Sequence, residues 1–128
     1  MEIVDGRMEG ELVQYDEGGA LLAKMLYKAG KLDGECLFYD GGQLKVCARY
    51  SNGLQEGESI VYGDGGQPAM KASYRAGKLD GLSSWFRPDG SLERTAHFAA
   101  GVKEGEAVEY DEDGDVVERI VYKDGKPQ

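Results

Sequence analysis

The chain has 128 residues, of which 41% are hydrophobic and 30% charged, and its 24 acidic and 15 basic residues give a net charge of −9. This length fits one domain or one short repeat array. The charge argues against a nucleic-acid backbone or an anionic membrane as the main partner, because both require a basic patch, and it leaves a basic protein open. The chain has no long apolar run for a membrane span, and its N-terminal Met-Glu-Ile-Val-Asp lacks the features of a secretion signal, so a cytoplasmic location is expected.

Glycine and aromatic residues recur with one period along the chain. The first glycine series, spaced by 24, 23, 24, 24 and 24 residues, is Gly6, Gly30, Gly53, Gly77, Gly101 and Gly125. A first aromatic row is Tyr15, Tyr39, Tyr62, Phe86 and Tyr110, and a second is Tyr27, Tyr50, Tyr74, Phe98 and Tyr122. These interleaved series predict one repeat domain over 1–128, with units at about 6–29, 30–52, 53–76, 77–100 and 101–124 and partial units at both ends.

Each unit is predicted to form two β-strands, because its apolar residues alternate with period two. The first strand of a unit is represented by 11–15 and 58–62, and the second by 43–50 and 115–122. The predicted fold is therefore all-β: a single extended twisted antiparallel sheet of about ten strands, roughly 45–50 Å long at about 4.8 Å per strand.

The turns within the units fix a predicted register. Gly41-Gly42 suits a two-residue turn, whereas Pro88-Asp89-Gly90 and Glu112-Asp113-Gly114 suit three-residue loops with a left-handed glycine. These turns place apolar residues opposite each other, in the pairs Tyr39 and Leu44, Phe86 and Leu92, and Tyr110 and Val116.

The core is expected on one face of the sheet, which would carry both aromatic rows. A repeated inward position has small residues in the middle of the chain and large ones in the outer units, namely Ala48, Ala72 and Ala96 against Met25 and Ile120. This pattern indicates a tight interior closed by larger residues at its ends.

The two cysteines, Cys36 and Cys47, are too few for a disulfide scaffold or a zinc site. With Gly41-Gly42 as a two-residue turn they should face each other on the outer side of the sheet. A disulfide is then geometrically possible, although a reducing cytoplasm would keep both as thiols.

Catalytic and metal chemistry find little support in the sequence. His97 is the single histidine, on the face opposite Phe98, and has no second histidine with which to build a site. The run 111–115 carries Asp at alternate positions as a calcium loop does, but its glycine is displaced by two and Tyr122 stands where the loop needs Glu. A solvated acidic turn is the favoured interpretation, so we expect no enzyme activity, no metal and no cofactor.

Two surfaces are candidates for binding a protein partner. The position before the first aromatic row reads Gln14, Phe38, Val61, Trp85 and Glu109, and its three apolar members should form a stripe on the face away from the aromatic rows. This stripe is either an interface or a second small core covered by twist or by a second copy of the chain. The acidic last unit, with Glu109, Asp111, Glu112 and Asp113, is either a docking patch for a basic partner or a solvated edge that prevents aggregation.

The segments Tyr27-Lys28-Ala29-Gly30-Lys31-Leu32-Asp33-Gly34-Glu35 and Tyr74-Arg75-Ala76-Gly77-Lys78-Leu79-Asp80-Gly81 resemble the MORN repeat in its bacterial variant. The resemblance implies an extended sheet of hairpins used for interaction. Bacterial members are commonly labelled antitoxins of toxin–antitoxin pairs. Other MORN proteins resemble scaffolds, some of them near membranes. The charge of −9 on this chain argues against a membrane role. The expected function is an antitoxin or immunity protein that blocks a basic toxin or effector by occlusion. The alternative is a scaffold or assembly adaptor that self-associates, for example as a homodimer through the outer face or an edge.

Overall fold

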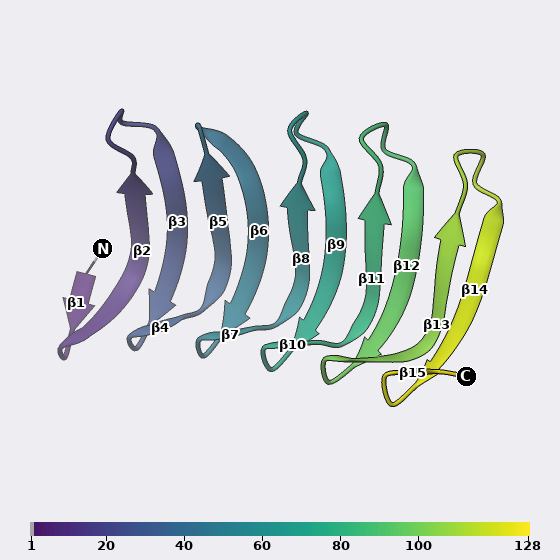
Figure 1. Cartoon of the computed structure of the whole chain (residues 1–128). Helices are drawn as coiled ribbons and strands as arrows, with labels where there is room; N and C mark the ends of the chain where they lie inside the picture. Colours follow the sequence, from purple (N-terminus) through teal and green to yellow (C-terminus); the bar gives the residue numbers. More distant parts are fainter. Residues whose placement is uncertain (1) are drawn as a thin grey trace.

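The computed structural model describes residues 2–128, and all of its regular elements in that range are β-strands, which confirms the predicted fold class (Figure 1). Fifteen strands form one antiparallel sheet. The ten long strands are β2 (Arg7–Tyr15), β3 (Leu21–Lys28), β5 (Gly34–Asp40), β6 (Gln43–Ser51), β8 (Gly57–Tyr62), β9 (Pro68–Arg75), β11 (Gly81–Phe86), β12 (Leu92–Ala99), β13 (Val102–Tyr110) and β14 (Val116–Lys123). The short strands are β1 (Glu2–Val4), β4 (Lys31–Leu32), β7 (Leu54–Gln55), β10 (Lys78–Leu79) and β15 (Lys126–Pro127).

The strands follow each other across the sheet in chain order, from β1 at one end to β15 at the other (Figure 1). The long strands pair as five hairpins, while β4, β7 and β10 fold back onto the strand that precedes each of them. Within residues 2–128 there is no helix that is long and apolar enough to cross a membrane.

The turns that close the hairpins have the predicted geometry. Asp40 pairs with Gln43, so Gly41 and Gly42 form a two-residue turn, with φ of 58° and 80°. In the hairpin of β11 and β12, the N–H of Gly90 donates to the carbonyl of Arg87 at 2.8 Å, and Gly90 has φ of 89°. This is a type I turn followed by a left-handed glycine.

A second set of turns ties each unit to the one before it. Ala29 and Gly30 both have positive φ, at 52° and 82°, and reverse the chain between β3 and β4. The N–H of Ala29 donates to the carboxylate of Glu9 at 2.7 Å, and that of Gly30 donates to the carbonyl of Met8 at 3.0 Å. In the later units the carboxylates of Asp33, Glu56, Asp80 and Glu104 accept in the same way from the N–H groups of Asn52, Ala76, Ala100 and Asp124.

Each hairpin contains a β-bulge that the sequence did not reveal. Phe86 pairs with Leu92 as predicted, but Trp85 pairs with Arg94, so Glu93 is an extra residue. The equivalent extra residues in the other hairpins are Leu22, Lys45, Ala69 and Val117. An extra residue changes which side chains share a face beyond it.

The prediction that both aromatic rows share one face is therefore wrong. Trp85 lines the same pocket as Phe98 and Tyr122, which belong to the second aromatic row. Phe86, of the first row, follows Trp85 directly on β11, and successive residues of a strand point to opposite faces. The two rows consequently lie on opposite sides of the sheet, and the face with the second row is called the hollowed face below.

Most of the buried residues form a narrow row of small side chains on the hollowed face, and Ala23 and Val108 are buried beside it. Cys36 pairs with Ala48 and Ser83 with Ala96, and all four are at most 5% exposed. At the two ends of this row, larger residues stand at the repeated position as predicted: Met25 opposite Leu12, and Ile120 opposite Ala107. The small side chains supply the buried centre, and the aromatic rings flank it or lie on the other face.

The expected pairing of Cys36 with Cys47 is also wrong. Cys36 pairs with Ala48, whereas Cys47 pairs with Leu37, because the bulge at Lys45 shifts the register by one residue. The two thiols point to opposite faces, and both are free. Cys36 is completely buried, and this burial raises the pKa of its thiol.

Candidate functional site: a row and a pocket on the hollowed face

One line of residues crosses the hollowed face from the first long strand to the last. Successive cross-strand pairings join them into what we call the central row: Gln14, Ala23, Phe38, Val46, Val61, Met70, Trp85, Arg94, Glu109 and Glu118. At about 4.8 Å per strand the row is roughly 43 Å long. The predicted stripe of Gln14, Phe38, Val61, Trp85 and Glu109 is thus present, although it shares its face with the second aromatic row.

The chemistry of the central row changes along its length. From Ala23 to Trp85 its members are apolar, and Val61 is 38% exposed in the middle of this stretch. From Arg94 onward they are charged. The apolar part and the charged part are continuous, because Trp85 and Arg94 are direct cross-strand partners.

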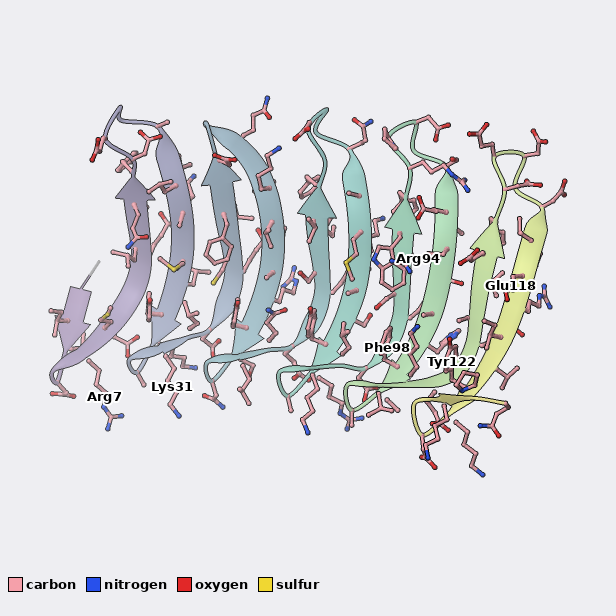
Figure 2. All side chains as sticks on the ribbon, viewed as in Figure 1. Arg7, Lys31, Arg94, Phe98, Glu118 and Tyr122 are labelled. Carbon is pink, nitrogen blue, oxygen red and sulfur yellow. The ribbon has the colours of Figure 1, made fainter. Side chains whose placement is uncertain are left out.

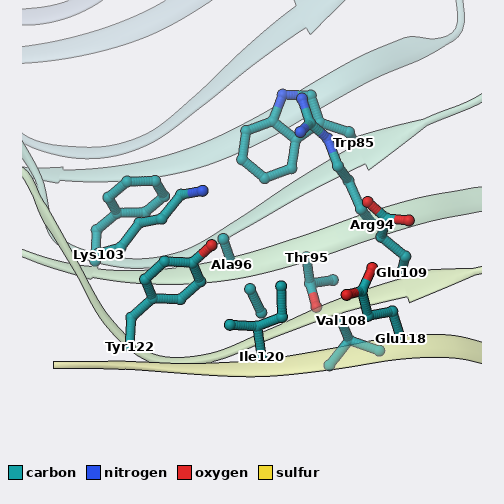
Figure 3. A pocket seen from close by; sticks show the side chains of 12 residues that line it. Trp85, Arg94, Thr95, Ala96, Lys103, Val108, Glu109, Glu118, Ile120 and Tyr122 are labelled. Atoms are coloured by element: carbon teal, nitrogen blue, oxygen red, sulfur yellow. The ribbon is translucent and has the colours of Figure 1, made fainter. Parts of the chain in front are cut away.

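A pocket of about 300 Å³ lies on the hollowed face over β11 to β14 (Figure 3). Its floor is apolar and includes Ala96, Ala107 and Ile120. Lys103 and Tyr122 lie at one end, and Trp85, Arg94, Glu109 and Glu118 lie at the other (Figure 3). Phe98, the cross-strand partner of Lys103, also lines the pocket. In Figure 2, Phe98 and Tyr122 lie close to the turns that follow β12 and β14, whereas Arg94 and Glu118 lie farther from those turns. The pocket therefore has two polar ends and an apolar floor.

The two cations of the pocket are held against aromatic rings. The guanidinium of Arg94 lies 4.3 Å from the centre of the Trp85 ring, and the ammonium of Lys103 lies 4.8 Å from the centre of the Tyr122 ring. Such cation–π contacts are each worth about 0.5–1 kcal/mol at exposed sites. They orient both cations along the walls of the pocket.

The two carboxylates of the pocket stand directly opposite each other. Glu109 on β13 pairs with Glu118 on β14, and on its other side Glu109 pairs with Arg94. The ion pairs among residues 2–128 are Lys45 with Asp64, Arg49 with Glu35, and Arg119 with Glu106. Neither pocket carboxylate takes part in them, so two like charges share one cross-strand position, which is destabilising in a sheet.

The structure places the predicted site residues in three groups. Trp85 and Glu109 line the pocket, whereas Phe38 and Val61 lie further along the central row. Glu112 and Asp113 are exposed in the loop between β13 and β14. The carboxylate of Asp111 accepts from the N–H groups of Asp113 and Asp115, both at 2.9 Å, and so stabilises its own turn.

Sequence reasoning missed Arg94, Lys103, Glu118 and Tyr122 as pocket residues. A signal for two of them was present: Arg94 and Glu118 occupy the unit position that holds Ala23, Val46 and Met70 earlier in the chain. Comparing this position between units shows the same change from apolar to charged that Trp85 and Glu109 show. The sequence does not reveal the bulge, however, and only the bulge places this position on the same face as Trp85.

Among residues 2–128, no group of three or more His, Cys, Asp or Glu side chains could hold a metal ion. His97 is exposed, with its Nδ1 3.2 Å from the carbonyl oxygen of Glu106. It pairs with Leu82 on the face opposite Phe98.

The comparisons with known proteins bear on the repeat. The family model described as "MORN repeat variant" matches residues 8–29 and 103–124. A search of curated proteins found no match. Among solved structures the chain is similar to one in "Crystal structure of GtfA/B complex bound to UDP and GlcNAc", with 12% identity and a TM-score of 0.32 over 87% of this chain and 24% of the other. The chain spans about a quarter of the length of that structure.

The open sheet of repeated hairpins and the family match together define a class of protein, the repeat-built binding modules. More specifically, two of its units, at residues 8–29 and 103–124, match the MORN repeat variant, which supports a protein built from MORN-type repeats. MORN repeats are non-catalytic modules that bind proteins or membranes.

Proposed function

We propose that this protein is a non-enzymatic, cytoplasmic module that binds a basic protein partner on its hollowed face. In its most concrete form it is an antitoxin or immunity protein, which blocks a toxin or effector by covering it. The observation that carries this proposal is the central row, where a partly exposed apolar stretch runs directly into a charged end.

The apolar stretch supplies the kind of contact that stabilises protein interfaces. Phe38 and Trp85 are half-buried, and Val61 is more exposed, so a partner can remove further apolar surface from water at each of them. Tryptophan is among the residues that most often dominate the binding energy of an interface. An extended, partly exposed apolar row on a sheet face is typical of a docking surface.

The charge of the chain favours a basic partner over a nucleic acid or an anionic membrane. Residues 101–128 contain nine acidic and four basic residues, so this segment contributes −5 of the total of −9. A concentrated charge of one sign accelerates association with a partner of opposite charge, and salt weakens this effect.

The direct test uses the protein encoded next to this one in its source genome. Binding is measured by calorimetry with wild type and with Trp85→Ala, which should weaken binding at least tenfold. Phe86→Ala is the matched control, because Phe86 is the adjacent ring on the opposite face, and it should change affinity less than twofold. If the neighbour is a toxin that wild type does not bind, the antitoxin proposal is wrong.

One observation favours a second candidate function, a scaffold that self-associates. The edge strand β14 pairs with β15 only at Tyr122 and Lys123, and its Val117 and Val121 are 63% and 51% exposed. Open apolar edges promote pairing between sheets. Light scattering should then give a dimer or larger species that Val121→Lys returns to monomer. A wild type that stays monomeric up to about 100 μM contradicts the scaffold.

A further inference from the structure

Four side chains stand at one register on four successive strands at the end of the central row. Trp85 pairs with Arg94, Arg94 with Glu109, and Glu109 with Glu118. Neighbouring strands are about 4.8 Å apart, so the two carboxylates lie next to each other at the far end of this line. The single tryptophan of the chain stands at its near end.

The carboxylates of Glu109 and Glu118 remain without an ion-pair partner in the described chain, although cations are close to them. Arg94 is the direct neighbour of Glu109, but its guanidinium stacks on Trp85. Lys103 lies over Tyr122 at the other end of the pocket. The loop that follows β13 adds Glu112, Asp113 and Asp115, which are also exposed and outside the ion pairs of residues 2–128.

The pocket beside these carboxylates suits a side chain with an apolar stem and a positive head. Ile120 lies between Glu118 and Tyr122 in sequence and shares their face, so the floor next to the carboxylates is apolar. Lys and Arg bury their methylene stems along apolar surface and keep the charged group at a polar end. An acidic or a purely apolar side chain would leave the facing carboxylates unneutralised.

We infer that the pocket receives a lysine or arginine side chain of a protein partner, with its charged head between Glu109 and Glu118 and its stem against Ile120. This inference rests on the proposed binding function and adds the chemistry of the anchoring contact. The pocket then recognises one basic residue at a defined place on the partner. The exposed acidic residues of the adjacent loop attract other basic residues near it. A bound cation reduces the electrostatic repulsion between the two carboxylates, and this favours binding of a positively charged group.

The inference can be tested with hexalysine as a defined probe and Trp85 fluorescence as the signal, in about 10 mM salt, where screening is weak. The pocket variant is Glu109→Gln/Glu118→Gln. The matched control is Glu11→Gln/Glu58→Gln, which removes the same charge from two exposed residues on the opposite face. Circular dichroism and the thermal midpoint verify the fold of both variants, and Glu109→Gln alone replaces the double variant if that one is unstable.

We expect the pocket variant to weaken hexalysine binding at least tenfold and to abolish the Trp85 response, and the control to stay within twofold of wild type. Equal weakening in both variants, or no binding by wild type, overturns the inference. Either overturning result leaves the proposed function standing, because that function is tested separately by Trp85→Ala against the protein partner. Conversely, a partner that wild type fails to bind defeats the proposed function whatever hexalysine does.

Discussion

At the scale of single residues, the buried row of the hollowed face is notable for its small and partly polar members. Of the equivalent positions Leu12, Cys36, Ser59, Ser83 and Ala107, the middle three carry a thiol or hydroxyl group in the centre of the sheet. Ser83 is 1% exposed, and its Oγ has no hydrogen-bond partner within residues 2–128. Burying a polar atom without a partner costs free energy, so this row is not optimised for stability.

Replacing Ser83 by alanine should therefore stabilise the protein. The change removes the buried hydroxyl and matches the alanine that Ala107 provides in the next unit. We expect the free energy of unfolding in urea to rise by about 1 kcal/mol. Ser84→Ala is the control, because Ser84 is the adjacent, half-buried residue on the other face, and it should change stability by less than about 0.5 kcal/mol. A destabilised Ser83→Ala would mean that the hydroxyl is satisfied.

The two thiols should make stability fall at alkaline pH. Burial raises the pKa of Cys36 and of Cys47 above the ordinary value of 9.0, so the folded state keeps their protons when the unfolded chain has lost them. The contribution is fully present below pH 9.0 and is lost as pH rises through the raised values of the folded state. Urea unfolding at pH 7.5 and at about pH 10 should show a smaller loss in Cys36→Ala/Cys47→Ala than in wild type. An identical loss in the two proteins would contradict this assignment.

At the scale of the elements, the units are joined by a repeated pair of hydrogen bonds. A carboxylate that directly precedes a glycine at the start of each unit, such as Glu56 before Gly57, accepts from the N–H of the first residue of the next turn, as Glu56 does from Ala76 at 2.7 Å. The glycine of the same turn donates to a carbonyl of the preceding unit, as Gly77 does to Gln55 at 2.9 Å. These bonds hold turns whose first residue has the left-handed φ that L-residues disfavour, such as 51° at Ala76.

Removing one such carboxylate should loosen one junction. Glu56→Ala leaves the N–H of Ala76 without its acceptor, and we expect a loss of about 0.5–1.5 kcal/mol in the free energy of unfolding. Glu58→Ala, two residues further on and without such a bond, should have a much smaller effect. Hydrogen exchange should show the same contrast locally, with the amide of Ala76 exchanging faster only in Glu56→Ala. Equal destabilisation by both variants would argue against the junction.

The elements were largely predictable from the sequence, whereas their faces were not. The glycine period located the hairpins, and Gly41-Gly42 and Pro88-Asp89-Gly90 fixed the register next to the turns. The bulge residues Leu22, Lys45, Ala69, Glu93 and Val117 share no property, because such a bulge needs no special φ and accepts any residue. Each bulge reverses the faces of the residues that follow it in the second strand of its hairpin. Cys47 therefore lies on the face opposite Cys36, and Arg94 and Glu118 share the face of Trp85, neither of which the sequence predicted.

At the scale of the whole molecule, the core is one continuous row that no single unit can build. Each buried residue packs between neighbours on both sides, as Ala72 does between β8 and β11, so the stability of the array depends on its nearest-neighbour contacts. Only the end positions, at Met25 and Ile120, have large residues.

A large residue in the middle of the row should therefore be costly. Ala72 is 4% exposed, and Ala72→Ile puts there the residue that is native at Ile120 in the last unit. We expect a loss of about 1–3 kcal/mol from overpacking, measured by urea unfolding. Ala99→Ile makes the same change at an exposed strand position and should cost nothing. If Ala72→Ile were as stable as wild type, the central part of the row would not be tightly packed.

The change of character between Trp85 and Arg94 gives the sheet a direction. In an array of equal repeats, the same side chains would line the hollowed face along its whole length. In this protein, a ligand bound in the reversed orientation would place its apolar end against Glu109 and Glu118 and its charged end against Phe38. Under the proposed binding function, the hollowed face would therefore distinguish the two ends of an elongated partner.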